Sequence, residues 1–129
     1  MPPDRRPRED SRRDEARRDA ALLLDMLLAA EDAQGFVAGM DEAAFLASAL
    51  HQSAVIRQIT IIGEAANRVS RAFQATHPAI AWPDIIGMRH RLVHGYDEVR
   101  LDQVWAVVRH HLPALAATLR PLIPPDEPA

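Results

Sequence analysis

Apolar residues recur every three or four positions along much of the chain, the spacing expected of helices that bury one face. The first such segment covers about residues 11–33, and Ser11 can cap its N-terminus. Its apolar face consists of Leu23, Met26, Leu27 and Ala30. Residues 1–10 are charged and rich in proline, so we expect a disordered tail there.

A second periodic segment covers residues 41–73, with Asp41 as its N-cap. It is predicted as one long helix, and a break near Ser48 is the alternative. Small residues on one face allow another backbone to come close, which favours a place at the centre of a bundle; they are Ala49, Ser53, Gly63 and Ala66. His77-Pro78 ends the segment, because the residue before a proline disfavours helical backbone.

Two more helices are predicted toward the C-terminus. The first begins at Trp82-Pro83-Asp84, since proline suits a first helical turn and an acid suits the positive end of the dipole. Gly95 is expected to end it as a left-handed cap. The last helix runs from about Leu101 to Arg120, with a kink at Pro113.

The pattern therefore predicts an all-α fold, a bundle of four to five helices, because no segment alternates with period two over a useful length. The helical domain is placed at residues 11–121, between the N-terminal tail of residues 1–10 and a flexible C-terminal tail of residues 122–129. Phe45, Trp82 and Trp105 are expected in its core.

Composition narrows the function classes. The chain has 129 residues, a formal charge of -3 and no cysteine, which excludes disulfides and thiolate chemistry. All 15 basic residues are arginine, which donates paired hydrogen bonds to phosphate oxygens. The overall charge nevertheless creates no strong positive field. No apolar run approaches the roughly 20 residues of a membrane span, so we expect a cytoplasmic protein with no membrane partner.

Candidate chemistry concentrates in one stretch, Arg89-His90-Arg91-Leu92-Val93-His94-Gly95-Tyr96. Histidine is the side chain whose charge changes near neutral pH, and arginine binds phosphate oxygens through two parallel donors. If the helix continues through this stretch, His90 and His94 lie one turn apart. The cluster indicates a candidate site for general acid–base chemistry.

Four ordered blocks resemble the HepT family of HEPN domains: Ile61-Ile62-Gly63-Glu64-Ala65-Ala66, then Ala81-Trp82-Pro83 through Gly87-Met88-Arg89, then Arg89, His94 and Tyr96 as Arg-x4-His-x-Tyr, and Val104-Trp105. The similarity covers about residues 20–120. Two positions depart from it: His90 stands where asparagine or a small polar residue is most frequent, and Arg100 stands where many members have a capping aspartate. Asp97 or Asp102 is the expected substitute for that cap.

The resemblance implies a helical, dimeric, metal-independent endoribonuclease that acts as the toxin of a toxin–antitoxin system and needs no cofactor. It implies that Arg89 and His94 are catalytic and that RNA is the substrate. It also implies a partner, a minimal nucleotidyltransferase antitoxin of the MntA type, that silences the toxin by attaching AMP to Tyr96. A homodimer is expected, with a higher hetero-oligomer as a further possibility.

The residues fit this chemistry on physical grounds. RNA cleavage without a metal needs a base for the 2′-hydroxyl, an acid for the leaving oxygen and a cation for the charged phosphorane. On a continuous helix, Arg89 and His94 would be rotated by about 140° from one another, so a cleft shared by two protomers is expected. The acid is then the partner's His94, or His90. Glu64 is expected to support the site by pairing with Arg89.

Other readings of the same residues stay open. His90 and His94 could be solvated side chains at a helix end, or two ligands of a metal ion without a third nearby. His110 and His111 are expected at the surface. The chain as a whole could be a catalytically inactive helical module that serves as the partner and substrate of the nucleotidyltransferase.

Overall fold

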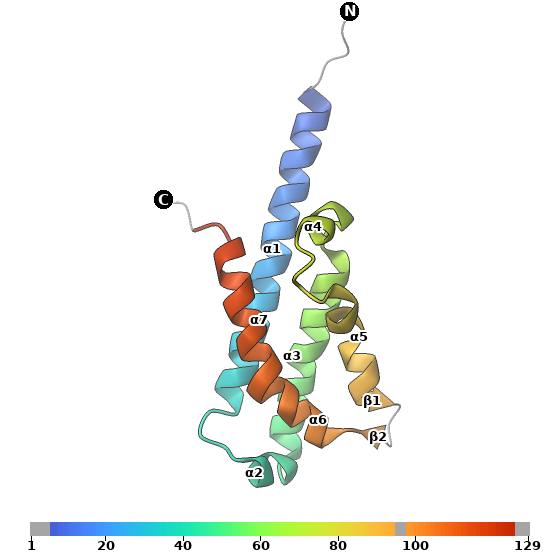
Figure 1. Ribbon diagram of the computed structural model, residues 1–129. Helices are drawn as coiled ribbons and strands as arrows, with labels where there is room; N and C mark the ends of the chain where they lie inside the picture. The colour runs from blue at the N-terminus through green and yellow to red at the C-terminus, as the bar shows by residue number, and fades with distance from the viewer. Residues whose placement is uncertain (1–5, 95–97, 126–129) are drawn as a thin grey trace, which may run out of the picture.

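The computed structural model describes residues 6–94 and 98–125, and within these residues the protein is a bundle of helices with one small hairpin (Figure 1). The all-α class predicted from the sequence is confirmed. In chain order the elements are α1 (Arg6–Phe36), α2 (Glu42–Leu46), α3 (Ala49–Arg68), α4 (Arg71–Thr76), α5 (Trp82–Leu92), β1 (Val93–His94), β2 (Glu98–Val99), α6 (Leu101–Ala106), the π-helical turn η1 (Val107–His111), α7 (Leu112–Leu119) and the 3₁₀ turn η2 (Arg120–Leu122).

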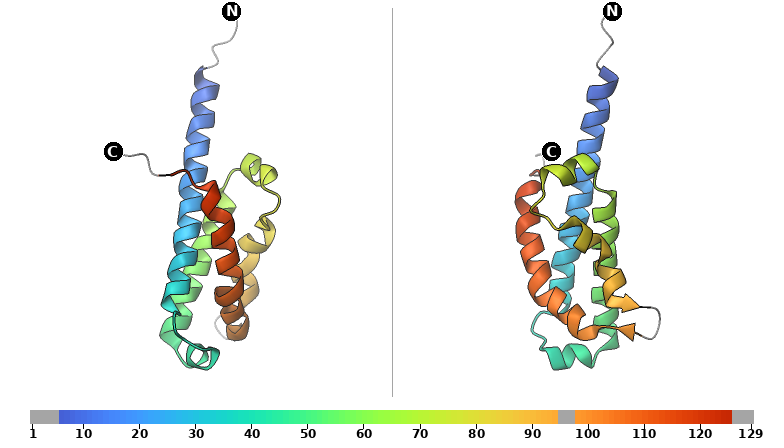
Figure 2. Two further views of the ribbon diagram at one scale, coloured as in Figure 1. Left: turned by 60° about the vertical axis from the view of Figure 1, so that its left-hand side comes forward. Right: turned by 45° about the vertical axis from the view of Figure 1, so that its right-hand side comes forward.

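The core lies between α1, α3, α5 and the last helical segment. Helix α1 packs along α3 and also against α7, while α5 packs on the other side of α3 (Figure 2). At Gly63 the backbones of α3 and α5 come so close that an added Cβ would lie 3.4 Å from the carbonyl oxygens of Ile85 and Ile86. The large side chains buried most completely are Leu23, Met26, Val37, Phe45, Val55, Ile59, Ile62, Val104, Val108, Leu112 and Leu119.

Helix α1 begins earlier than expected. It is helical from Arg6, whereas residues 1–10 were predicted to be a disordered tail and Ser11 to be the first cap. Charge pairs explain this difference, because Glu9 and Arg13, and Asp14 and Arg18, stand four residues apart with the acid first, the spacing that supports a helix. The first turns of α1 project beyond the rest of the bundle (Figure 1).

The predicted cap at Asp41 and the alternative of a break near Ser48 are both confirmed. Asp41 accepts a hydrogen bond from the Ala44 amide at 2.8 Å, so it caps α2 as expected. Ser48 accepts one from the His51 amide at 3.3 Å and caps α3, so the alternative with a break near Ser48 is the correct one.

A second break, at Val69, was not expected. The segment predicted as one helix to residue 73 is divided here, because Ser70 starts α4 and accepts a hydrogen bond from the Phe73 amide. The cause lies 51 residues away. Asp19 of α1, only 6% exposed, accepts hydrogen bonds from the Ser70 amide at 2.8 Å and from the Ser70 hydroxyl at 2.6 Å.

The end of α5 also differs from the prediction. The helix starts at Trp82 with Pro83 in its first turn, as expected, but it ends at Leu92 rather than continuing to Gly95. Strands β1 and β2 follow as an antiparallel pair, with Val93 opposite Val99 and His94 opposite Glu98. Gly95 itself lies outside the described residues.

The last predicted helix is present in three consecutive parts, α6, η1 and α7. The proline ring at position 113 would clash with the carbonyl four residues earlier in a regular helix, and the widened turn of η1 makes room for it. Arg100 precedes α6 without a side-chain cap, as its chemistry predicted. No helix in the described parts of the chain is long and apolar enough to cross a membrane.

The Asp19–Ser70 contact gives a test of stability. Asp19→Ala should lower the free energy of unfolding by about 1–3 kcal/mol, because the part-buried Ser70 amide and hydroxyl lose their acceptor on Asp19. Urea denaturation of this variant can be compared with that of Asp25→Ala, an exposed acid on the same helix. Equal midpoints for the two variants would show that the contact contributes nothing to the fold.

Candidate functional site

The residues singled out from the sequence gather at one end of the bundle, where α5 passes into the hairpin (Figure 1). Arg89, His90 and Arg91 form the last turn of α5, and His94 lies on β1. The side chains of all four are exposed. Tyr96, the predicted site of AMP attachment, lies outside the described residues.

His90 and His94 are in contact. Their ring centroids are 5.9 Å apart, with the planes at 75°, an edge-to-face arrangement. The expectation that both histidines sit on one helix was wrong, because His94 has left α5 and is held by strand pairing. The 140° separation expected between Arg89 and His94 therefore does not apply, and one protomer alone brings two imidazoles together at the end of the helix that carries Arg89.

The two arginines of the motif have different surroundings. Arg91 donates to the Asp84 carbonyl oxygen at 2.8 Å and forms an ion pair with the Asp84 carboxylate at 3.4 Å. Both side chains are more than half exposed, so this pair contributes little to stability. Arg89 forms no ion pair with any of the described residues, so its guanidinium remains available for an anionic ligand.

Glu64 does not fulfil its expected role in the protomer. It is exposed on α3, and the expected ion pair with Arg89 is absent from the described part of the chain. The structure thus brings His90 and His94 together, places Arg89 in the same last turn of α5 as His90, and leaves Glu64 as a separate exposed carboxylate.

Glu98 is a candidate that the sequence did not indicate. It stands directly opposite His94 in the hairpin, and both side chains are exposed. No local pattern could have shown this, because each strand has only two residues, too few to show an alternation. The prediction of a helix through His94 also hid the relation between His94 and Glu98.

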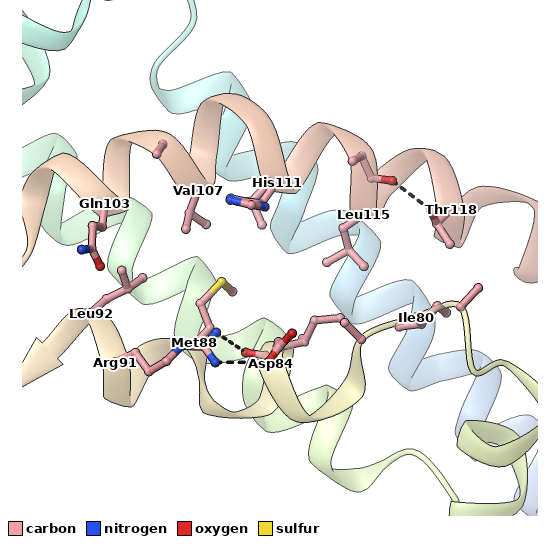
Figure 3. Close-up of a pocket in the computed structure, with 16 residues that line it drawn as sticks. Ile80, Asp84, Met88, Arg91, Leu92, Gln103, Val107, His111, Leu115 and Thr118 are labelled. Atoms are coloured by element: carbon pink, nitrogen blue, oxygen red, sulfur yellow. Dashed lines mark hydrogen bonds and ion pairs between the residues drawn. The ribbon is translucent and has the colours of Figure 1, made fainter.

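A groove of about 650 Å³ runs between α5 and the helical segment η1–α7 (Figure 3). Its floor is apolar, with Met88 and Leu115 pointing into it from opposite sides, and its rim carries Arg91 and His111. Neither Arg89 nor His94 lines it. The groove and the histidine pair are therefore separate features.

The structure also bears on the metal alternative. Among the described residues, no group of three or more histidine, cysteine, aspartate or glutamate side chains is arranged to hold a metal ion.

Fold and site together define a class: a small helical-bundle protein whose exposed arginine and histidine pair suit proton transfer at a phosphate. Comparison with known proteins makes this more specific. A model of the family described as "Ribonuclease HepT-like" matches residues 26–122, a range that includes the whole site. The chain belongs to the HepT-like ribonuclease family.

Individual relatives agree with this assignment. "Putative RNase MJ1380" of Methanocaldococcus jannaschii is 31% identical over 95 residues, which cover 74% of this chain and 87% of the relative. "Probable ribonuclease HepT" of Thermococcus cleftensis is 38% identical over 71 residues, which cover 55% of this chain and 64% of the relative. No solved structure gives a significant match. The resemblance stated from the sequence is confirmed.

Proposed function

We propose that this protein is a metal-independent endoribonuclease and the toxin of a toxin–antitoxin system. The observation that carries the proposal is the contact between His90 and His94 beside Arg89, on an exposed end of the fold. Family membership supports ribonuclease activity, and the names of the relatives refer to RNases. The toxin role rests on the resemblance of the Arg-x4-His-x-Tyr motif.

The chemistry divides between three side chains. His94 removes the proton from a ribose 2′-hydroxyl, and the 2′-oxygen attacks the adjacent phosphorus. The bond from phosphorus to the 5′-oxygen breaks as that oxygen takes a proton from a second imidazole. Arg89 stabilises the charged phosphorane through its two parallel donors. The products are a 2′,3′-cyclic phosphate and a 5′-hydroxyl end.

His90 is the best candidate for the second imidazole. Its ring contacts that of His94 within one protomer, so both can reach the same phosphate without help from another chain. The alternative acid is the partner's His94. It was favoured mainly by the expected angle between Arg89 and His94, which assumed that α5 continues through His94.

A homodimer remains part of the proposal. The resemblance implies it, and α3 and α5 carry isoleucines that are only partly buried where they pack against the core, at Ile56, Ile61 and Ile86. An isologous contact through these two helices would cover that apolar surface and bring two copies of Arg89 into one cleft.

Control by the antitoxin centres on Tyr96. This residue belongs to the three-residue connection between β1 and β2, two positions from His94. Attack of its phenolic oxygen on the α-phosphorus of ATP, catalysed by the nucleotidyltransferase, would attach AMP and release pyrophosphate. The added anion and base would compete with RNA phosphate for the arginines.

Metal independence is the first test of activity. Purified protein should cut single-stranded RNA in the presence of EDTA and leave 2′,3′-cyclic phosphate ends, since histidines and arginine carry the reaction. End-group analysis by mass spectrometry identifies the cyclic phosphate ends. A strict magnesium requirement would refute the mechanism. If neither the protein expressed alone nor the protein separated from its antitoxin cuts RNA, the inactive binding module is favoured.

Substitutions in the motif test the assigned roles. His94→Ala should reduce cleavage by at least about 100-fold, the usual contribution of a general base. Arg89→Lys should reduce it by about 10-fold, because lysine keeps the charge but loses the paired donors. Arg91→Lys is the matched control, since Arg91 is held by Asp84 and should change the rate by less than about twofold. Equal losses at both arginines would contradict the assignment of Arg89.

The dimer can be tested at its apolar surface. Light scattering should give twice the protomer mass at micromolar concentration, and Ile61→Asp should shift the protein to the monomer, because a buried unpaired carboxylate is unfavourable. Leu50→Asp, at a side chain 76% exposed at the start of α3, is the control. A wild-type monomer that still cuts RNA would rule out the shared cleft.

Silencing should depend on the Tyr96 hydroxyl. Incubation with the nucleotidyltransferase and ATP should add the mass of AMP to the peptide that contains Tyr96 and stop RNA cleavage. Tyr96→Phe should keep most of the ribonuclease activity, because the hydroxyl takes no part in proton transfer, and should resist silencing. Added mass on another peptide, or full silencing of Tyr96→Phe by the enzyme's activity, would contradict this control.

A further inference from the structure

We infer that Glu98 is a positioning residue that orients the imidazole of His94, an inference that rests on the proposed ribonuclease function. Its basis is the register of the hairpin, in which His94 and Glu98 are direct partners. Two side chains directly opposite one another in an antiparallel pair lie on the same face of the sheet.

The backbone fixes how close the two residues are. The Arg100 amide donates to the Leu92 carbonyl oxygen at 2.9 Å, so the Leu92–Arg100 pair is hydrogen-bonded. Because such pairs alternate along an antiparallel ladder, His94 and Glu98 form the next hydrogen-bonded pair, with Cα atoms about 5.5 Å apart. A carboxylate and an imidazole can meet across that distance through rotation of their side chains.

The two faces of the hairpin are distinct. Val93 and Val99 are half-buried and pack against the core, while His94 and Glu98 are exposed. The valine pair thus anchors the hairpin, and the polar pair is held on its outer face. This arrangement fixes the positions of both residues while their side chains stay accessible to substrate.

His94 then has a defined neighbour on each side. The ring of His90 contacts it from the last turn of α5, and Glu98 stands opposite it on β2. The protomer has no ion pair between His94 and Glu98 within the described residues, so the carboxylate acts when its side chain turns toward the ring. Catalytic hydrogen bonds are often long before substrate binds.

A carboxylate in this place has a clear chemical use. A histidine that acts as a base must present one bare nitrogen to the substrate and keep its proton on the other. A carboxylate that accepts the N–H of the second nitrogen fixes this tautomer and stabilises the imidazolium that forms. His90 cannot do this equally well, because an imidazole carries no negative charge.

Glu98→Gln keeps the shape of the side chain and removes its charge. If Glu98 positions His94, this variant should lower kcat by about 10- to 100-fold, the usual range for groups that orient a functional histidine. KM should stay unchanged, and Glu98→Asp should recover part of the loss. Asp32→Asn changes an exposed acid on α1 that has no ion-pair partner among the described residues; it is the matched control and should behave like the wild type.

Imidazole ¹⁵N NMR gives a readout that does not depend on cleavage. Glu98→Gln should change the ¹⁵N shifts of His94 from those of one tautomer toward a mixture, while Asp32→Asn leaves them unchanged. If wild-type protein cuts RNA and Glu98→Gln cuts equally fast, or loses activity through KM alone, the inference is overturned while the proposed function stands. If wild-type protein cuts no RNA, the proposed function fails, and unchanged His94 shifts in Glu98→Gln overturn the inference as well.

Discussion

The geometry of the site depends on the backbone pairing that ends α5. The hydrogen bond from the Arg100 amide to the Leu92 carbonyl oxygen is the first link of this pairing, and the register of Val93 with Val99 and His94 with Glu98 follows from it. Without it, α5 could add another turn and His94 would take a helical position. The pairing places His94 beside His90 at a ring distance of 5.9 Å.

Packing in the core explains why the chain reverses at this point. Leu92 is almost fully buried, and Val93 and Val99, opposite one another in the strand pair, pack against the core. Helix α6, which follows at once, must return to pack against the start of α3 and against α2. A longer α5 would carry the chain away from that contact, and the β-branched Val93 and Val99 suit extended backbone better than helix.

Local chemistry explains what the sequence could predict. Asp41 and Ser48 accept hydrogen bonds from amides within a few residues, and the fixed φ of Pro83 suits a first helical turn, so these helix starts depend on local chemistry and could be predicted without knowledge of the fold. The histidine and arginine cluster, and its family, could likewise be recognised from spacing. A kink was expected at Pro113, and the structure accommodates that proline with a π-helical turn.

Contacts between distant residues explain what the sequence could not predict. The break at Val69 depends on Asp19, which is 51 positions from Ser70, and no pattern near either residue indicates the contact. The hairpin was missed because two residues per strand are too few to show alternation. Glu98 was missed for the same reason, since its relation to His94 exists only once the register is known.

The same structure separates the groups that stabilise the fold from those available for chemistry. Asp19 is buried, and each of its carboxylate oxygens accepts a hydrogen bond from Ser70 within the protomer. Arg89 and His94 are exposed, and neither has an ion-pair partner among the described residues. Exposed groups of this kind contribute little to folding free energy. Their concentration at the end of α5 is therefore better explained by binding and chemistry than by stability, and substitutions there should affect activity while the bundle stays folded.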